Sequence, residues 1–245
     1  MRNAILITGF NGEIGRQTLH SLCKRKIHII ALDINKSDIK YDNVMFIKDS
    51  ILNQDVIKSI FNDFNIIEIY HFAALLSQSA NDNPELANKV NEEGSKAIIN
   101  TAMHYAQTNK SFIKIFFPSS IAVYGPRKLK NAKELDIMKP QTIYGCNKLA
   151  IEQYGTNKHE ESLKLGFGID FRCLRLPGII SPYTIPYGGT TDFAPQMLHA
   201  ACNNESFICK VDPMTILPFL GIENAVKAIL DIMSFKNIDS NLRSF

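Results

Sequence analysis

A tyrosine and a lysine lie four residues apart, at Tyr144 and Lys148, and a serine, Ser120, precedes them. Positions i and i+4 share one face of a helix, so the phenol and the ammonium can point at the same substrate. Tyrosine has a pKa of about 10 and is a poor base unless a nearby positive charge, such as Lys148, favours the phenolate. The Ser120 hydroxyl can orient a substrate oxygen. These side chains predict a site that takes the proton of a substrate hydroxyl while a hydride leaves the same carbon.

Each of these residues also has a simpler interpretation. Pairs of the form Tyr-x-x-x-Lys arise by chance on many helices, and Lys148 could be a surface lysine. Ser119 and Ser120 could serve only a turn, and alternation along a strand would let only one of them face the site. Cys146 lies between the tyrosine and the lysine, but no histidine is placed by the sequence to activate it as a nucleophile, so it receives no role.

Three glycines near the start of the chain indicate a cofactor site. Gly9, Gly12 and Gly15 follow the apolar run at 4–8, where a strand would turn into a helix. Glycine there permits a tight turn and lets backbone N–H groups approach a pyrophosphate at the helix N-terminus. A glycine-rich turn can also be only a compact loop, so a second signal is needed.

Asp33 supplies this second signal, because it follows the second apolar run, where a carboxylate would accept hydrogen bonds from the adenosine ribose. The same carboxylate would repel a 2′-phosphate, so NAD is favoured over NADP, although Arg16 beside the glycines is a counter-signal. Asp49, after the third run, could contact adenine or only form a turn. His71 ends the fourth run and is expected to be a core histidine. The short side chains after it, at 73–74, would let the backbone pack close to the dinucleotide.

The hydrophobic pattern predicts the elements that position these groups. Apolar runs rich in β-branched or aromatic residues are separated mostly by stretches of helical periodicity, which predicts an α/β fold with a Rossmann-type, doubly wound parallel sheet. Asn83 and Pro84 mark the start of a helix over 84–107, and helical patterns return near 193–203 and 222–234. The apolar runs lie at 4–8, 27–32, 44–47, 66–72, 113–117 and 169–176.

The alternation fades after residue 177, where a segment rich in proline and glycine begins. We therefore divide the chain into a NAD-binding Rossmann domain at 1–177 and a substrate-binding or lid region at 178–245, part of which returns to the Rossmann core. The ending Asn-Leu-Arg-Ser-Phe resembles the start of another strand, so the chain is expected to be truncated, either naturally or as a fragment.

Composition narrows the possible partners. The 245 residues are 45% hydrophobic and carry a net charge of +3 that is spread along the chain, which argues against a nucleic-acid surface. No apolar run reaches membrane-spanning length, and the start leaves no room for a signal peptide, so a cytoplasmic location is expected, with a mitochondrial one still open. The five cysteines lack paired spacing and indicate neither a disulfide framework nor a metal site.

The segments around these residues resemble the extended short-chain dehydrogenase/reductase superfamily, and within it the short-chain type of L-threonine 3-dehydrogenase. Gly188 to Ala194, which reads Gly-Gly-Thr-Thr-Asp-Phe-Ala, is the most specific of them. The resemblance implies oxidation of L-threonine at C3 to L-2-amino-3-ketobutyrate, a step of threonine catabolism toward glycine or aminoacetone. The other segments that carry the resemblance are 71–77, 118–126, 142–145 and 170–181.

The resemblance also implies roles for individual residues. Ser120, Tyr144 and Lys148 would form the catalytic triad, and helices of the 84–107 and 143–165 type could pair two subunits into a homodimer. Substrate would be bound by Ser77, Ser120, Tyr144, Thr190 and Thr191. NAD would be bound by Gly9, Asn11, Gly12, Glu13, Ile14, Gly15, Asp33, Asp49, Ser50, Phe72, Ala73, Ala74, Tyr144, Lys148, Leu176, Gly178 and Ile179.

Two departures from the family pattern keep other functions open. Tyr187 stands where the family usually has glycine, and family members continue beyond Phe245. One alternative is a sugar-nucleotide epimerase or dehydratase, which would use the same tyrosine and lysine with permanently bound NAD. The other is a truncated NAD-binding remnant without catalytic activity.

Overall fold

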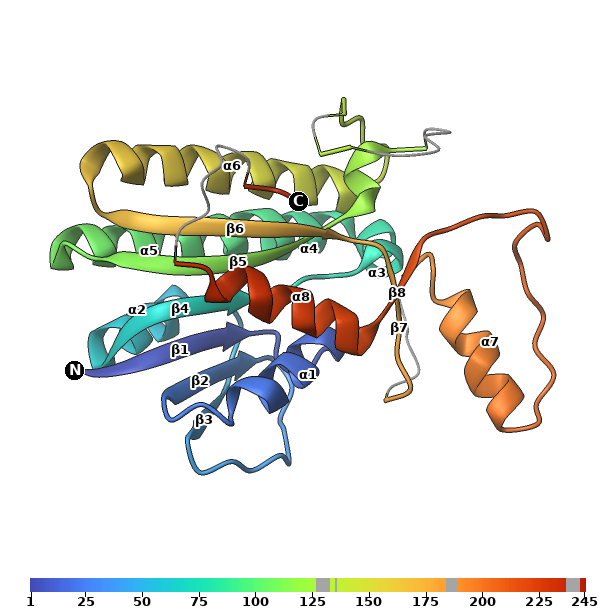
Figure 1. Ribbon diagram of the computed structural model, residues 1–245, viewed down its shortest axis with the longest axis horizontal. Coiled ribbons are helices and arrows are strands. Elements are labelled where there is room, and N and C mark those ends of the chain that lie inside the picture. The colour runs from blue at the N-terminus through green and yellow to red at the C-terminus, as the bar shows by residue number, and fades with distance from the viewer. Residues whose placement is uncertain (127–132, 135, 184–188, 237–242) are drawn as a thin grey trace.

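The computed structural model describes residues 1–126, 133–134, 136–183, 189–236 and 243–245. Its centre is a six-stranded parallel sheet in the order β3-β2-β1-β4-β5-β6, which confirms the predicted doubly wound fold (Figure 1). The predicted apolar runs coincide with these strands. The strands are β1 (Arg2–Thr8), β2 (His28–Asp33), β3 (Val44–Lys48), β4 (Phe64–His71), β5 (Phe112–Ser120) and β6 (Gly168–Leu176).

Helices cover both faces of this sheet. α2, α5 and α6 lie on one face, while α1 and α8 pack side by side on the other (Figure 1). A separate pair of short parallel strands, β7 and β8, lies beyond β6. The bounds are α1 (Glu13–Leu22), α2 (Gln54–Asp63), α3 (Ser77–Asp82), α4 (Pro84–Ala87), η1 (Asn88–Gly94), α5 (Ser95–Asn109), η2 (Ile121–Tyr124), α6 (Ile143–Leu165), β7 (Gly178–Ile180), α7 (Phe193–Cys202), β8 (Phe219–Gly221) and α8 (Ile222–Ser234).

Alternate side chains of β1 enter the two apolar layers. Ala4 and Leu6 belong to the layer under α2 and α5, whereas Ile5 and Ile7 belong to the layer under α1 and α8. All four are fully buried. Full burial of a leucine or isoleucine contributes about 1.5–3 kcal/mol, so a central strand that is buried on both faces is stabilised by a continuous apolar run.

The predicted helix over 84–107 begins where expected. The Asn83 side chain accepts a hydrogen bond from the Leu86 N–H at 3.1 Å, and Pro84 occupies the first helical position. The helix then widens into one π-helical stretch, η1, before α5 continues to Asn109. Helical periodicity does not reveal this widening, which carries the buried Asn91.

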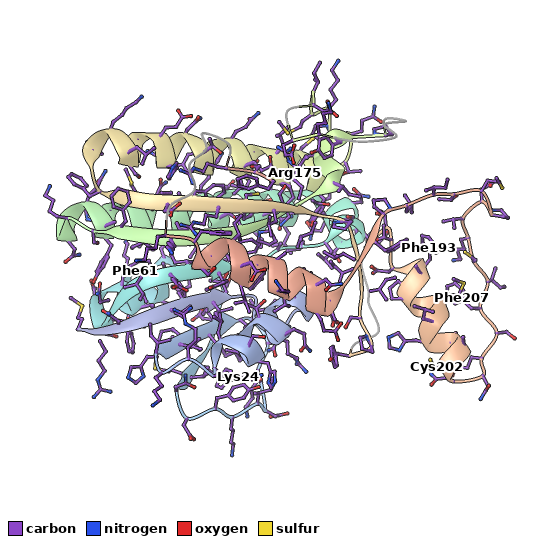
Figure 2. All side chains as sticks on the ribbon, viewed as in Figure 1. Lys24, Phe61, Arg175, Phe193, Cys202 and Phe207 are labelled. Carbon is purple, nitrogen blue, oxygen red and sulfur yellow. The ribbon has the colours of Figure 1, made fainter. Side chains whose placement is uncertain are left out.

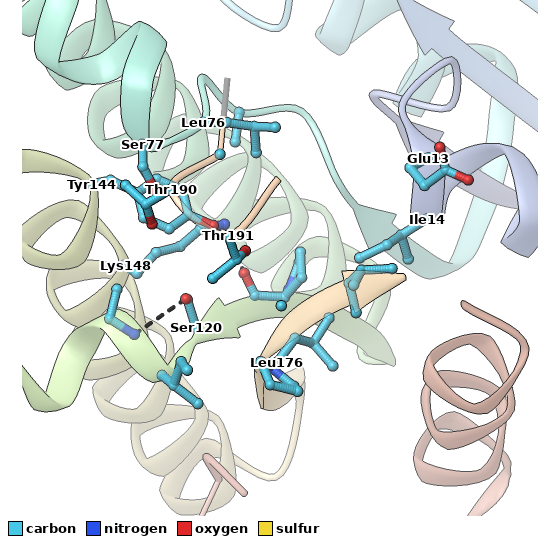
Figure 3. Close-up of a pocket in the computed structure, with 18 of the residues that line it drawn as sticks. Glu13, Ile14, Leu76, Ser77, Ser120, Tyr144, Lys148, Leu176, Thr190 and Thr191 are labelled. Atoms are coloured by element: carbon cyan, nitrogen blue, oxygen red, sulfur yellow. Dashed lines mark hydrogen bonds between the residues drawn. The ribbon is translucent and has the colours of Figure 1, made fainter. Parts of the chain in front are cut away.

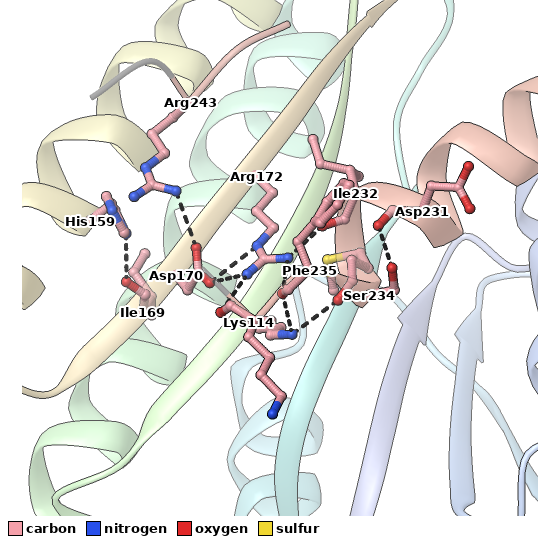
Figure 4. A network of polar contacts seen from close by, with 12 residues as sticks. Lys114, His159, Ile169, Asp170, Arg172, Asp231, Ile232, Ser234, Phe235 and Arg243 are labelled. Carbon is pink, nitrogen blue, oxygen red and sulfur yellow. Dashed lines mark hydrogen bonds and ion pairs between the residues drawn. The ribbon is translucent and has the colours of Figure 1, made fainter. Parts of the chain in front are cut away.

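Helix α8 and the last described residues of the chain pack against the sheet. Ile229 and Met233 of α8 pack in the layer with Ile5 and Ile7. The residues at 243–245 lie beside β6, where the Cys173 N–H donates to the Arg243 carbonyl at 2.9 Å and Ser244 forms an isolated bridge with Cys173 (Figure 4). The division of the chain at residue 177 stays a prediction.

The segment that carries α7 projects from the sheet. Phe193 and Cys202, near the two ends of α7, lie apart from the layers that cover the strands (Figure 2). Several apolar side chains after α7 are strongly exposed, among them Ile208 and Ile216. Within the described part of the chain, no helix combines the length and the apolar character needed to cross a bilayer.

Candidate active site

A cavity of about 500 Å³ opens at the carboxyl ends of the central strands. The order of the strands reverses between β1 and β4, and ligands of open parallel sheets bind outside the strand ends at such a point. The glycine turn, the Tyr144 region and the Thr190 region all line this one cavity. Residues from the three segments, far apart in the sequence, therefore share a site.

The glycine turn is shaped by close backbone contacts. A Cβ atom on Gly15 would lie 2.4 Å from the Gly9 carbonyl oxygen. Gly9 itself has a φ of +69°, and a Cβ there would lie 2.4 Å from the Ala73 nitrogen. The turn is thus a compact loop, and Gly9, Gly12 and Gly15 also line the cavity, so the backbone of the turn is open to a ligand.

Asp33 organises the backbone beside this turn. Its Oδ2 accepts a hydrogen bond from the Asn11 N–H at 3.0 Å, and its Oδ1 accepts one from the Asn35 N–H at 2.9 Å. The Arg16 guanidinium donates to the Asn11 side chain at 3.2 Å. Asp33 and Asn11 are therefore brought next to the glycine turn, although neither lines the cavity itself.

Asp49 and Ser50 lie farther along the same edge of the sheet. The Asp49 carboxylate accepts hydrogen bonds from the Ser50 N–H at 2.7 Å and from the Asn53 side chain, and the Ser50 hydroxyl accepts one from the Leu52 N–H. This geometry is that of a turn leading into α2. The adenine contact of Asp49 and Ser50 stays a prediction.

The start of α6 fixes the tyrosine and the lysine. The Thr142 hydroxyl caps the helix by accepting a hydrogen bond from the Gly145 N–H at 3.0 Å. Gly145 packs against η2 so closely that a Cβ atom there would lie 2.8 Å from the Ala122 carbonyl oxygen. Because η2 directly follows Ser120, this contact holds Tyr144 next to the end of β5.

Ser120, Tyr144 and Lys148 are brought together (Figure 3). The Ser120 hydroxyl is close enough to the phenol of Tyr144 to influence its pKa, and it accepts the Ala122 N–H at 3.2 Å. Lys148 is only 3% exposed, and its ammonium donates to the Pro118 carbonyl at 2.7 Å. The ammonium lies 5.3 Å from the centre of the Tyr144 ring. The interpretation of Lys148 as a surface lysine is therefore wrong.

The protonation of these groups follows mainly from burial. Burial raises the pKa of Tyr144 to about 12, and the nearby Ser120 hydroxyl opposes this rise. Burial lowers the pKa of Lys148 to about 8, while the nearby negative charge of Glu152 raises it. The role of Lys148 in lowering the pKa of Tyr144 stays a prediction.

Sequence reasoning missed a buried ion pair behind the lysine. Glu152, one helical turn beyond Lys148, accepts a hydrogen bond from the Arg175 Nη2 at 2.7 Å, and both side chains are almost fully buried. Arg175 also donates to the Tyr124 hydroxyl at 2.9 Å and to the Glu134 carbonyl at 2.8 Å. The i+4 spacing from Lys148 to Glu152 was the available signal.

Of the other residues weighed from the sequence, Ser119 lines the cavity beside Ser120, whereas His71 and Cys146 do not line it. His71 is buried between the hydroxyls of Thr8, at 2.6 Å, and Ser95, at 2.9 Å, which confirms it as a core histidine. Cys146 is exposed. Ser119 is buried and its hydroxyl has no hydrogen-bond partner among the described residues.

Short hydroxyl side chains gather at the tyrosine end of the cavity. Ser77, Thr190 and Thr191 lie close to Tyr144, while Glu13 lies at the far side (Figure 3). Gly188 and Tyr187 of the adjoining block fall outside the described residues. The residues of the predicted NAD site that line the cavity are Gly9, Gly12, Glu13, Ile14, Gly15, Phe72, Ala74, Leu176, Gly178 and Ile179. Lining residues that the sequence analysis did not predict include Leu76, Pro118, Ser181, Asp192 and Leu217.

The parallel sheet, the glycine turn at its reversal point and the tyrosine and lysine above β5 define a Rossmann-type protein with the active-site pattern of short-chain dehydrogenases. More specifically, the chain belongs to the NAD dependent epimerase/dehydratase family, whose pattern matches residues 5–241.

Comparison with individual proteins refines this placement. The chain is 34% identical over 245 residues to L-threonine 3-dehydrogenase, mitochondrial, of Bos taurus, covering 98% of this chain and 63% of the bovine protein. It is 31% identical over 239 residues to an uncharacterized epimerase/dehydratase of Staphylococcus aureus, covering 94% of this chain and 70% of that one.

The fold is similar to that of a solved structure. A monomeric L-threonine 3-dehydrogenase from a metagenome database superposes with a TM-score of 0.82 and is 33% identical, covering 94% of this chain and 71% of that one. The present chain thus spans under two thirds of the bovine protein's length and somewhat more of the metagenome protein's.

Proposed function

We propose that this protein catalyses the NAD-dependent oxidation of L-threonine at C3 to L-2-amino-3-ketobutyrate. The observation that carries the proposal is the meeting of Ser120, Tyr144 and Lys148 with the hydroxyls of Ser77 and Thr190 in one cavity. The names of the bovine and metagenome relatives support the same substrate.

The residues at the glycine end fit NAD. Gly9, Gly12 and Gly15 expose backbone to the cavity and leave no space for a side chain at two of the three positions. The Asp33 carboxylate accepts two backbone hydrogen bonds and has lone pairs left for ribose hydroxyls. Leu176 and the 178–179 segment would line the nicotinamide side. When bound, NAD supplies a positively charged ring that accepts the hydride.

Ser120, Tyr144 and Lys148 act on the proton of the substrate hydroxyl. Ser120 and Tyr144 both line the cavity, so a substrate hydroxyl bound between them meets one group that orients it and one that accepts its proton. In its phenolate form Tyr144 takes that proton as the O–H electron pair forms the C=O bond and the C3–H pair departs with its hydrogen as hydride. The Lys148 ammonium, held by the Pro118 carbonyl, keeps a positive charge near the phenolate.

The decisive experiment measures NADH formation by the purified protein with L-threonine, beside L-serine and a sugar nucleotide. Tyr144→Phe removes the proton acceptor and should lower turnover by about 10²–10⁴-fold, while NAD binding, measured on the same samples, stays intact. Equal activity in the variant would contradict the proposal. NAD binding without turnover in the unmodified protein would favour the non-catalytic alternative.

A sugar-nucleotide epimerase or dehydratase is the second candidate, because the Staphylococcus aureus relative is named as an uncharacterized epimerase/dehydratase. Such an enzyme keeps its cofactor through the catalytic cycle. Cofactor that survives gel filtration, together with conversion of a sugar nucleotide without net NADH, would favour it. Threonine-dependent NADH would exclude it as the main activity.

The assembly and location are also proposals. We propose a homodimer that pairs the α5 and α6 faces, although one similar structure is described as monomeric. Sedimentation of the purified protein decides between the two. A cytoplasmic location stays our expectation, and the bovine relative's name places that protein in mitochondria. Fractionation of cells that express the protein tests it.

A further inference from the structure

The glycine end of the cavity carries a negative charge. Among the described residues, three charged side chains line the cavity: Glu13, Lys148 and Asp192. Lys148 and the segment that carries Asp192 lie at the tyrosine end, and Glu13 lies at the opposite side (Figure 3). Arg16 follows the third glycine, but its guanidinium donates to a neighbouring side chain and does not line the cavity. The charged side chain that lines the glycine end in the described part of the chain is therefore a carboxylate.

Glu13 stands where the cofactor's own charge would bind. It is the first residue of α1, and no side-chain hydrogen bond caps the start of this helix. The N–H groups of the first turn are thus open to an anion, and the helix dipole places the equivalent of about half a positive charge there. The pyrophosphate of NAD would bind at this helix end. A carboxylate on the same turn competes with the incoming anion for that positive end.

The Glu13 side chain is held in the cavity by a distant segment. Its Oε1 atom accepts a hydrogen bond from the hydroxyl of Ser181, which is 168 residues away and follows β7. Ser181 is buried and lines the same cavity. The other oxygen of Glu13, Oε2, is buried and has no hydrogen-bond partner among the described residues. The carboxylate is therefore fixed at the cavity wall instead of turning out into solvent.

No cation compensates this carboxylate within the described part of the chain. None of the ion pairs found there includes Glu13. Two like charges repel each other more strongly in a cavity than in water, because the effective dielectric constant is lower. A pyrophosphate at the start of α1 would therefore meet donors from the backbone and repulsion from this one side chain.

We propose that the Glu13 carboxylate opposes binding of the NAD pyrophosphate and so keeps the cofactor exchangeable. The inference rests on the proposed function and deepens it, because a dehydrogenase must release NADH after every turnover. The backbone N–H of Glu13 still serves the pyrophosphate, while its side chain limits how tightly the dinucleotide is held. Glu13 thus acts on cofactor exchange and not on the transfer of the proton or the hydride.

The test is the affinity of the purified protein for NADH, measured by fluorescence titration without threonine. Glu13→Gln retains an oxygen that accepts the Ser181 hydroxyl and removes the charge. We expect the Kd for NADH to fall by about tenfold, and the release of NADH, followed by stopped-flow fluorescence, to become slower. An unchanged Kd would overturn the inference. Weaker binding would also overturn it, since the carboxylate would then support the cofactor site.

A matched control removes a carboxylate from the start of another helix. Asp55 lies in the first turn of α2 and does not line the cavity. Asp55→Asn should leave the Kd for NADH unchanged. If both variants tighten NADH binding alike, the effect is one of general charge and the inference fails.

The charge of the ligand provides a readout that a purely structural effect would not move. ADP-ribose carries the pyrophosphate, whereas adenosine carries no phosphate, and both can be measured by displacement of NADH. Glu13→Gln should tighten the binding of ADP-ribose and leave that of adenosine unchanged. An equal gain for both ligands would overturn the inference.

Measuring binding without threonine separates this inference from the proposed function. Tighter NADH binding by Glu13→Gln, in a protein that forms no NADH from threonine, would sustain the inference and refute the dehydrogenase. Threonine-dependent NADH formation with equal NADH affinity in both proteins would do the reverse. Absence of NADH binding would overturn the inference.

Discussion

Replacing Glu152 with glutamine is expected to destabilise the protein strongly. Arg175 and Glu152 are 4% and 3% exposed, and the Arg175 Nη2 lies 2.7 Å from the Glu152 Oε2. Glutamine keeps the volume but removes the charge, so the guanidinium stays buried without its counter-ion. Breaking a buried pair in this way costs about 3–5 kcal/mol. At about 2–4 °C per kcal/mol for a protein of this size, the melting temperature should fall by about 6–20 °C.

The same substitution should alter the pH dependence of activity. The negative charge of Glu152 favours the protonated form of Lys148, whose pKa is about 8. Without that charge the pKa of Lys148 falls further, so Lys148 loses its proton at a lower pH. The alkaline limb of the kcat/KM profile that reports Lys148, followed by NADH absorbance, should move to lower pH. A purely structural role would leave the position of that limb unchanged.

A double-mutant cycle tests whether Glu152 and Arg175 stabilise the protein as a pair. Glu152→Gln, Arg175→Met and the double variant are unfolded in urea, and the double variant is expected to recover at least about 2 kcal/mol relative to the sum of the single losses. The control pair on the same helix, Lys158 and Glu161, is 28% and 45% exposed and should contribute at most about 1 kcal/mol. If the losses from Glu152 and Arg175 simply add, the reasoning is wrong.

Two further predictions concern single positions. Gly15→Ala should abolish NAD binding in a titration, because the new Cβ would lie 2.4 Å from the Gly9 carbonyl oxygen, whereas Gly166→Ala meets nothing within 4 Å and should cost only about 1–2 kcal/mol for its φ of +76°. Lys148→Met should abolish activity and change the pH dependence of unfolding. Burial holds the pKa of Lys148 near 8, against an ordinary value of 10.5, so the unfolded chain binds more protons between these values. The stability of the unmodified protein should therefore rise by about 3 kcal/mol relative to the variant between pH 8 and pH 10.5, and a constant difference would contradict the buried charge.

The sequence predicted the sheet because parallel strands buried on both faces need continuous apolar runs. Ile5 and Ile7 show this clearly, since each fills one layer while its neighbours fill the other. The start of the helix at Pro84 was equally readable, because an asparagine cap and a first-turn proline act locally. The π-helical stretch at 88–94 and the three-residue strands β7 and β8 were not, because their stability depends on contacts between distant segments.

The sequence predicted those features of the site that depend on the spacing between residues. The helical interval placed Tyr144 and Lys148 on one face, and the glycine spacing marked the turn at Gly9. Periodicity could not show that Arg175 on β6 meets Glu152 on α6, because that contact depends on how the helix packs on the strand. The environment of Lys148 was missed for the same reason: its depth in the protein, and hence its pKa, is set by the layers around it.

The end of β5 explains why a proline stands inside a central strand next to the reactive groups. Proline has no N–H to give to a neighbouring strand, and the pairing of β4 with β5 extends only as far as Tyr70 and Phe116. Pro118 therefore lies past the last residue of β5 that must donate to β4, and its carbonyl accepts the Lys148 ammonium at 2.7 Å. Two residues later the same strand delivers the Ser120 hydroxyl to Tyr144. One strand end thus anchors the charge, orients the hydroxyl and fixes their separation, while α6 contributes the tyrosine and the lysine from the opposite side.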